Sequence, residues 1–433
     1  MDIVYDVIII GGGAAGVLAA VELASSTNLT VALLEKARRL NDARNIGYCW
    51  LGASARSSAR LFKDPAVGGS GFSSEEWTQF AEHMRHYYGS PLKFKKPKLG
   101  KRTQKEIEDN GFAVAGHEMC TLSEEQFIRC ADRMHMVLKR NINIIHKCDI
   151  ASITKVPAGQ DLPEHFLIET DDFPYRAKQV LLSTGRSSQQ WWEDLPKNFS
   201  VPFSADSFNI GLRVEIPTHH IDSALTKDFE HKLYWDKWRT SMPIRRMNVE
   251  TEEVGQLKIS NSRQCHNGKK TYSSLSISCD HASGSAAQSQ QRLVALSNVL
   301  SDFQLSREPA SKLVSGDSVL SPIPEYSAFA LALKDLARII PNIIERGMIF
   351  SPEANLNVRK YALSPDGHSP TSGFYMMGDI TGHQTSFVQA AISGLRTANG
   401  IIAQTSKNKL KKKEELDYAT IESASRKKAK KED

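Results

Sequence analysis

The sequence predicts an α/β protein of two interleaved domains, and three observations lead to this prediction. A β-branched strand, a cluster of glycines and a helix open the chain, and a similar pattern of strand, glycine and helix returns near residue 400. The stretch between them has the short, turn-separated strands of a different architecture. A chain that begins one pattern, leaves it and returns is expected to form a discontinuous domain with an insertion.

The first element is a buried strand that runs into a glycine turn. Val7–Ile10 is short, β-branched and bounded by glycine, as a parallel strand would be. Gly11, Gly13 and Gly16 follow in GxGxxG spacing. The first glycine permits a tight turn, the second lets a pyrophosphate approach, and the third lets the helix pack closely on the strand.

A helix, a second strand and an acid complete this unit. Ala14–Ala24 is helix-forming, and its free amide groups would face a phosphate. Val31–Leu34 is the second strand, and Glu35 follows where a carboxylate accepts hydrogen bonds from a ribose. The unit predicts a dinucleotide site; the alternative is a tight turn without a ligand.

Later elements follow from periodicity and capping. We expect a helix over 73–88, capped by Ser73 or Ser74, and another from a capping-box-like Ser123 to Leu138. Strands are expected at 143–150, at the antiparallel pair 152–156 and 165–170, and at 176–185. In the second domain we expect a strand at 211–216, several short strands within 242–278 with a turn at Asn267-Gly268, and helices at 290–305 and 326–340.

Composition excludes several classes of protein. The chain has 433 residues, of which 40% are hydrophobic and 24% charged, so a large ordered core is expected. No apolar run reaches the ~18 residues of a membrane span, and the expected location is cytoplasmic. The six cysteines form no CxxC pair, so neither a zinc site, nor any other metal site, nor a close redox pair is expected.

The net charge of +6 is unevenly distributed. Residues 406–433 carry ten Lys and Arg against six acids and are expected to form a disordered tail or a frayed helix. Lys93 to Lys105 contains no acid. Both stretches suit nucleic acid or another anionic partner, and both also suit a solvated surface.

Two further motifs lie at strand ends. In KQVLLSTGRS a strand ends at Thr184-Gly185-Arg186, whose small residues let a dinucleotide approach the backbone. In YMMGDITGHQTSFVQAAISG, Gly378-Asp379 follows a strand and precedes an Ala-rich helix. Asp379 would accept hydrogen bonds from a polyol such as a ribityl chain, or would cap the helix. The helix start at 385–388 would direct its dipole toward the pyrimidine edge of a flavin.

Together these motifs resemble the glutathione-reductase-like class of FAD proteins, and most closely its FAD-dependent dehydrogenase-like family. The likeness covers residues 1–405 and is carried by LLSTGRSSQQWW, FNIGLRVEIP, ALALKDLARIIPN and the terminal GDITGH. It implies a Rossmann-type, three-layer ββα FAD-binding domain with an inserted α+β substrate domain. The sequence departs from that family in its bulky Tyr48, Cys49 and Trp50, and in lacking a cysteine near 240–247.

The expected division follows from these motifs. The FAD-binding domain would comprise residues 1–62, 118–200 and 345–405, and the substrate domain 63–117 and 201–344. The expected cofactor-binding residues are Gly11, Gly13, Ala14, Ala15, Gly16, Glu35, Lys36, Arg44, Ile150, Thr184, Gly185, Arg186, Gly378, Asp379, Ser386 and Phe387.

Residues for catalysis and for the substrate are fewer. His383 follows Asp379 and is the candidate acid or base, with a hydrogen-bonded structural histidine as its alternative. Arg213 and Glu215 alternate with apolar residues on one strand, so both face one side of that sheet. They would line a substrate pocket if that side faces the flavin, and would otherwise form a surface or interdomain pair.

The expected function is that of an FAD-dependent oxidoreductase. A hydride would pass through flavin N5 between an unidentified substrate and a nicotinamide or other acceptor, with NAD(P)H as a candidate donor. Two alternatives stay open: a flavin-dependent enzyme that modifies nucleic acid, and a protein that holds FAD as a redox sensor or scaffold without turnover.

Overall fold

The computed structural model describes residues 3–37, 50–52, 60–89, 91–96, 98–122, 124–160, 162–205, 208–221, 231–241, 244–245, 247–254, 257–264, 272–281, 306–321, 324–355 and 359–407. Several expectations fall outside them: the Asn267-Gly268 turn, the helix over 290–305, the Ser123 cap and most of the basic tail. Within these residues, no helix combines the length and apolar character needed to cross a bilayer.

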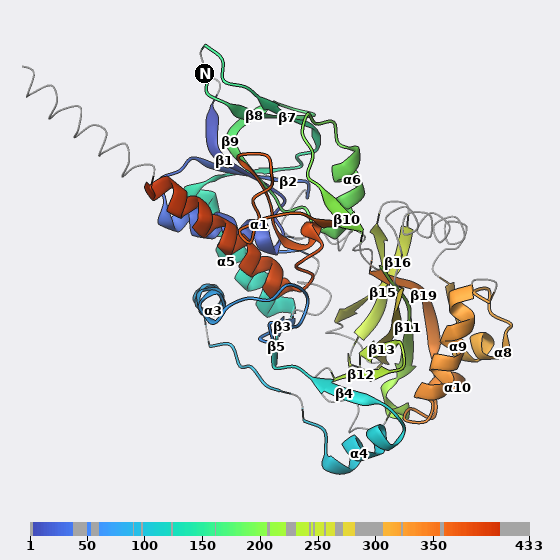
Figure 1. Cartoon of the computed structure of the whole chain (residues 1–433). Helices are drawn as coiled ribbons and strands as arrows, with labels where there is room; N and C mark the ends of the chain where they lie inside the picture. The colour runs from blue at the N-terminus through green and yellow to red at the C-terminus, as the bar shows by residue number, and fades with distance from the viewer. Residues whose placement is uncertain are drawn as a thin grey trace, which may run out of the picture.

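A parallel sheet forms the centre of the first half of the molecule (Figure 1). Its strands lie in the order β6 (Asn143–His146), β2 (Val31–Glu35), β1 (Val4–Ile10), β9 (Tyr175–Leu182), with β21 (Phe374–Met376) also beside β9. The apolar run of β1 is fully buried, as a strand covered on both faces requires. The Rossmann-type fold predicted from the opening motif is confirmed.

An antiparallel meander extends from β9 through β8 (His165–Thr170) to β7 (Ile150–Val156). This confirms the strand pair expected at 152–156 and 165–170. Aromatic residues cover one face of the first sheet. Among them, Trp192 of α6 (Gln189–Asp194) stacks on Phe374 with ring centroids 5.1 Å apart.

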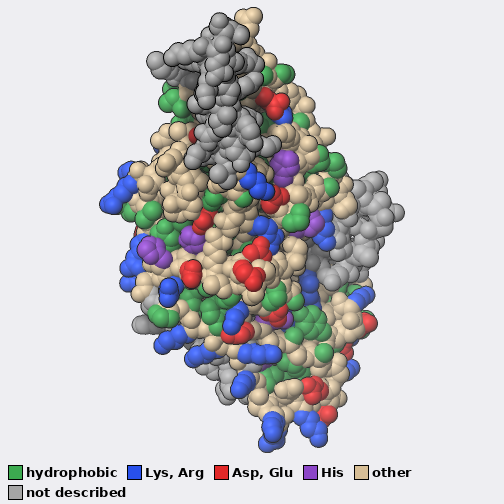
Figure 2. All heavy atoms as spheres, turned by 60° about the vertical axis from the view of Figure 1, so that its left-hand side comes forward, with side chains coloured by type: hydrophobic (Ala, Val, Ile, Leu, Met, Phe, Trp, Pro, Cys, Tyr) green, Lys and Arg blue, Asp and Glu red, His purple; other side chains and the backbone are tan. Residues whose placement is uncertain are grey.

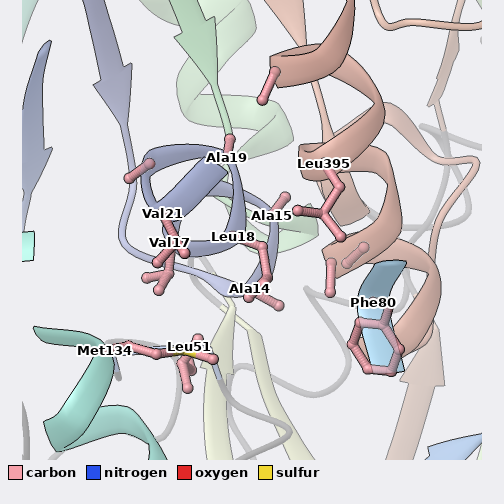
Figure 3. Packing of buried hydrophobic residues seen from close by; sticks show 14 of the residues in the cluster. Ala14, Ala15, Val17, Leu18, Ala19, Val21, Leu51, Phe80, Met134 and Leu395 are labelled. Atoms are coloured by element: carbon pink, nitrogen blue, oxygen red, sulfur yellow. The ribbon is translucent and has the colours of Figure 1, made fainter. Parts of the chain in front are cut away.

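Helices cover the other face of the first sheet. They are α1 (Ala14–Ser26), α3 (Ser74–Tyr88), α5 (Glu124–Asn141) and a carboxy-terminal helix over 387–407. Small residues let them approach closely, and Figure 3 shows Ala15 and Leu18 of α1 near Leu395 of the carboxy-terminal helix. A Cβ on Gly394 would lie 2.1 Å from the Ala15 carbonyl oxygen. The three layers predicted for the first domain are therefore present.

The expected cap of α3 is confirmed. Ser73 accepts a hydrogen bond from the Glu76 N–H, and the Glu76 carboxylate accepts one from the Ser73 N–H, which is a complete capping box. Gly89 ends the helix in the left-handed region with φ of 81°.

A second, antiparallel sheet lies beside the first layer system. Its strands follow the order β18 (Ser306–Pro309), β19 (Met348–Asn355), β11 (Phe208–Pro217), β17 (Tyr272–His281), β13 (Trp238–Ser241), β12 (His231–Trp235), β4 (Ala113–Gly116), with β14 (Ile244–Arg245) also beside β17. Helices α8 (Ala310–Ser315), α9 (Pro324–Leu336) and α10 (Ile343–Arg346) pack on one face through apolar residues such as Leu212, Val214 and Ile277. Figure 1 shows these helices on the side away from the first sheet.

Smaller elements lie outside the two main sheets. They are the ribbon β15 (Met247–Val254) and β16 (Leu257–Gln264), the pairs β3 (Arg60–Phe62) with β5 (Met119–Thr121) and β10 (Phe203–Ala205) with β20 (Arg359–Tyr361), the helix α4 (Lys101–Asp109), and the 3₁₀ turns η1 (Arg186–Ser188), η2 (Thr218–His220) and η3 (Gly378–Thr381).

Two segments lie elsewhere than the expected domain division placed them. β19 falls after residue 345, yet it pairs with β11 and β18 in the second sheet because Ile349 joins the apolar face beside Val214. α3 falls within 63–117, yet its Phe80 and Met84 are buried in the helix layer of the first sheet.

Candidate cofactor site

The glycine turn joins β1 to α1 and fits the roles assigned to its three glycines. Gly11 has φ of +100°, and a Cβ there would lie 2.7 Å from the Ser183 carbonyl oxygen. A Cβ on Gly16 would lie 2.0 Å from the Gly11 carbonyl oxygen. The nearest atom to a Cβ on Gly13 is 3.5 Å away. The first and third glycines are therefore required by packing, whereas a Cβ on Gly13 would make only an ordinary van der Waals contact.

The start of α1 adds amide groups to this turn. Gly13 is the N-cap, and it makes no side-chain capping bond. No acidic residue lies in the first turn, and Ala14 and Ala15 are buried. The amino end of a 13-residue helix thus presents backbone N–H groups and a positive dipole to an anion.

Glu35 lies at the end of β2 beside the glycine turn. One carboxylate oxygen accepts a hydrogen bond from the Gly12 N–H and the other from the Ala37 N–H, the latter at 2.7 Å. Each carboxylate oxygen offers two acceptor positions, so a ribose hydroxyl can still donate to this side chain. Lys36 instead forms a surface salt bridge with Asp149 at 2.8 Å, which directs its ammonium away from the turn.

Ile150 reaches the same edge through the backbone. The Cys148 N–H donates to the Glu35 carbonyl oxygen at 3.1 Å, and the chain then enters β7 at Ile150.

Trp50, one of the bulky residues in which the sequence departs from the family it resembles, lies against the glycine turn. Its indole packs where a Cβ on Gly12 would lie, 3.0 Å from the ring carbon Cε3. The contact of Trp50 with Gly12 could not be predicted from the sequence, because it joins residues that are far apart along the chain.

The two strand-end motifs meet at the neighbouring strands β9 and β21. Arg186 Nε and Asp379 Oδ2 form an ion pair at 3.1 Å. Gly185 has φ of +80°, and no atom lies within 4 Å of the position of a Cβ. Thr184 Oγ1 accepts a hydrogen bond from the Ser188 hydroxyl at 2.6 Å.

Gly378 brings the carboxy-terminal motif against the amino-terminal one. It has φ of +75°, and a Cβ there would lie 2.9 Å from Ala15 Cβ in the first turn of α1. The Gly378 N–H donates to the Ser393 hydroxyl at 2.8 Å. Glycine turn, Glu35, Thr184-Gly185-Arg186 and Gly378-Asp379 therefore share one edge of the first sheet.

Comparison with known proteins supports the cofactor for this edge. Residues 6–64 match the family described as FAD binding domain. This segment is similar to part of an FAD-binding domain. None of the curated proteins compared with the chain matches it.

Solved structures with FAD are among those that align with the chain. A Diels-Alderase, PyrE3, has 13% identity and a TM-score of 0.40, covering 90% of this chain and 63% of its own. Glycine oxidase from Geobacillus kaustophilus has 12% identity and a TM-score of 0.42, covering 92% and 95%. L-α-glycerophosphate oxidase from Mycoplasma pneumoniae, with FAD bound, has 12% identity and a TM-score of 0.44, covering 93% and 95%. The chain spans less than two thirds of the length of PyrE3.

The start of the carboxy-terminal helix differs from the expectation for the FAD-binding domain. The N–H groups of Thr385 and Ser386 both donate to the Gly68 carbonyl oxygen, at 2.6 and 3.2 Å. The Phe387 side chain packs against Phe80 and Phe127 in the helix layer. Ser386 and Phe387 therefore contact other parts of the chain, and their roles at the cofactor stay predictions.

A glycine loop supplies those contacts. The sequence GGSG at 68–71 is held in place by Gln389. The Gln389 amide donates to the carbonyl oxygens of Pro65 and Val67, at 2.8 and 3.1 Å, and accepts from the Gly71 N–H at 3.0 Å. Sequence reasoning missed Gln389 because its partners are far away in the chain; Gly71 is 318 positions from it.

His383 has the contacts of a structural histidine. Its Nε2 lies 3.0 Å from the Tyr361 carbonyl oxygen and so must carry the proton that bonds to it. Its own carbonyl oxygen accepts from the Ser70 N–H at 3.0 Å. Nδ1 alone would be left to act as an acceptor, and a catalytic role stays a prediction.

Arg213 and Glu215 lie on the face of the second sheet that is opposite α8, α9 and α10. Their register partners on β17 are Ser276 and Ser274. Arg213 is buried and pairs with Glu353 at 2.7 Å, not with Glu215. Burial raises the pKa of Glu215, and the Arg307 guanidinium partly opposes this. Figure 1 shows this face turned toward the FAD-binding domain. Arg44 lies outside the described residues.

Proposed function

We propose that the protein is an FAD-dependent oxidoreductase. The observation that carries this proposal is the close approach of Gly378 to Ala15 at the start of α1, because these residues belong to the two motifs expected to hold opposite parts of FAD. The family match over residues 6–64 supports the cofactor. The proposal extends from that domain to the activity of the whole chain.

The residues on this edge fit the parts of FAD. Gly11, Gly13 and Gly16, with the amides of Ala14 and Ala15, would hold the pyrophosphate. Glu35 would accept from the adenosine ribose, and Asp379 from the ribityl chain. Bound FAD would supply hydride transfer at N5, between a substrate and a nicotinamide or other acceptor.

The substrate would lie between the FAD-binding domain and the second sheet. Arg213 and Glu215 lie on the sheet face turned toward that domain, and ionisable groups with restricted solvent access are typical of functional sites. NADH or NADPH is the proposed electron donor.

The cofactor is tested with a pair of glycine variants. Gly13→Ala fits the fold, because φ at Gly13 is −72° and a Cβ meets its nearest atom only at 3.5 Å. The added methyl group enters the pyrophosphate space, so we expect FAD and ADP to bind about tenfold more weakly or worse. Gly159→Ala is the matched control, because no atom lies within 4 Å of its Cβ position.

The measurements separate cofactor binding from turnover. Binding is measured by quenching of flavin fluorescence, and both variants are first shown to have the unfolding midpoint of the wild type. Equal FAD affinity in Gly13→Ala and wild type would overturn the proposed site. Turnover is measured by anaerobic titration of the yellow protein with NADH and NADPH. A photoreduced flavin that never reoxidises with oxygen, quinone or dye would instead support a sensor or scaffold.

A further inference from the structure

A strongly basic segment, residues 93–105, runs from the β3–β5 pair into α4. Its seven cations are all exposed: Lys93, Lys95, Lys96, Lys98, Lys101, Arg102 and Lys105. No described residue forms a salt bridge with any of them, although Lys96 lowers the pKa of Asp64 slightly, after the larger effects of His117 and the Ala66 N–H. The segment contains no Asp or Glu, and its seven charges exceed the net charge of the whole chain, +6.

The backbone of the basic segment is attached to the part of the molecule that is built on the first sheet. Lys95 and Met119 exchange two backbone hydrogen bonds, N–H to carbonyl oxygen, at 2.9 and 3.0 Å. Phe94 packs edge-on against Trp77, with ring centroids 5.1 Å apart. The side chains on either side of Phe94 are therefore held on the solvent side.

The other end of the basic segment is attached to the second sheet. Leu99 packs against the apolar core of that sheet, and Ile107 of α4 is buried in it. α4 exposes Lys101, Arg102 and Lys105. Figure 2 shows Lys and Arg side chains gathered toward the lower end of the molecule, the end at which Figure 1 places α4.

Like charges held at fixed positions repel one another, and here no acid within the segment relieves that repulsion. A surface that serves only to keep a protein in solution generally carries charges of both signs, interspersed. An anionic polymer that lies along the segment would relieve the repulsion and release its own counterions.

The chemistry of the surface favours nucleic acid over membrane. Among the described residues of this segment none is a large exposed hydrophobic side chain; Leu92, Phe94 and Leu99 pack inward. A helix that binds a membrane surface inserts such side chains, but the apolar side of α4 faces the protein core. We propose that the basic segment binds the phosphate backbone of a nucleic acid without reading its sequence.

The test uses the full chain with FAD added, and a fluorescent single-stranded RNA of mixed sequence. Binding is followed by fluorescence anisotropy at KCl concentrations from about 50 to about 200 mM, a range that includes physiological ionic strength. The variant is Lys93→Gln, Lys95→Gln, Lys98→Gln and Lys101→Gln together. We expect about tenfold weaker binding or worse, and a plot of log affinity against log salt that is shallower by roughly 3, at about 0.7 per lost contact.

The matched control replaces four other exposed lysines: Lys139, Lys312, Lys334 and Lys407, each by Gln. It removes the same charge, and we expect it to keep the affinity and most of the salt slope. Both variants retain residues 408–433, and both are checked for the flavin spectrum and unfolding midpoint of the wild type. Three results would overturn the proposal: no RNA binding by the wild type, equal losses in variant and control, or binding to phosphatidylserine vesicles but not RNA that is lost in the variant.

Discussion

Gly16 is the residue at which the fold, more than the cofactor, demands glycine. A Cβ would lie 2.0 Å from the Gly11 carbonyl oxygen and 2.6 Å from Ser183 Oγ. The backbone of α1 and the end of β1 cannot both keep their places around a methyl group. This distinguishes Gly16 from Gly13, although the GxGxxG spacing marks both in the same way.

We predict that Gly16→Ala destabilises the protein without any cofactor present. The free energy of unfolding should fall by about 1–3 kcal/mol from overpacking, even though alanine is the better helix former by about 1 kcal/mol. Urea unfolding of the apoprotein measures the change, with Gly159→Ala as control. An unchanged midpoint in Gly16→Ala would show that the helix and strand are less closely packed.

Single residues also show where sequence reasoning reached its limit. The positions of Glu35, Gly378 and Asp379 at strand ends could be predicted, because each follows a strand of recognisable pattern; their roles toward FAD stay predictions. His383 could not be decided from sequence, because its partner is the carbonyl oxygen of Tyr361, a group that every residue carries.

At the scale of elements, strands and helices with clear periodicity were predictable and their ends were not. The strand expected over 143–150 ends at His146, since Lys147 has φ of 59° and turns the chain before β7 begins. The loop 68–71 is held by Gln389, through contacts that local sequence does not encode.

The pairing of α3 with the carboxy-terminal helix gives a prediction with a pH dependence. Glu76 and Arg396, 320 positions apart, form two side-chain hydrogen bonds, one of 2.9 Å between Oε2 and Nη2. The Arg396 guanidinium holds the pKa of the Glu76 carboxyl below its ordinary value of 4.5; partial burial opposes this, and the Ser73 N–H supports it. A lowered pKa means that the stabilisation is complete above pH 4.5 and is lost as pH falls through the folded-state pKa.

Arg396→Gln should therefore lower the free energy of unfolding by about 1.5–3 kcal/mol at neutral pH. The difference from wild type should shrink below about pH 4.5, as Glu76 takes up a proton. Arg338→Gln, which breaks an exposed pair with Asp335, is the control and should cost about 0–0.5 kcal/mol. A difference between Arg396→Gln and wild type that persists unchanged to pH 3, on the order of one unit below the ordinary pKa of a carboxyl, would contradict this account.

At the scale of the whole molecule, the interleaved architecture was predictable and its borders were not. The return of strand, glycine and acid near residue 378 indicated a discontinuous first domain. β19 could not be assigned from its own residues, because membership of a sheet depends on register with β11, a strand far away in sequence.

Binding of FAD should raise the stability of the first sheet and of the helices that pack on it. FAD at 100 times its Kd should stabilise the part that binds it by about 2.7 kcal/mol. In a thermal scan followed by flavin release and by tryptophan emission, this shift should appear in wild type and disappear in Gly13→Ala. A shift of equal size in both proteins would mean that FAD binds elsewhere.

The close approach of Gly378 to Ala15 also has a consequence for the order of events during biosynthesis. The amino-terminal turn leaves the ribosome early, but its partner is translated only after both cores have been specified. At about 5–20 residues per second, the glycine turn of the nascent chain stays without its carboxy-terminal partner for some tens of seconds. Flavin loading is thus a late event, and chaperones that shield α1 meanwhile would raise the yield of coloured protein.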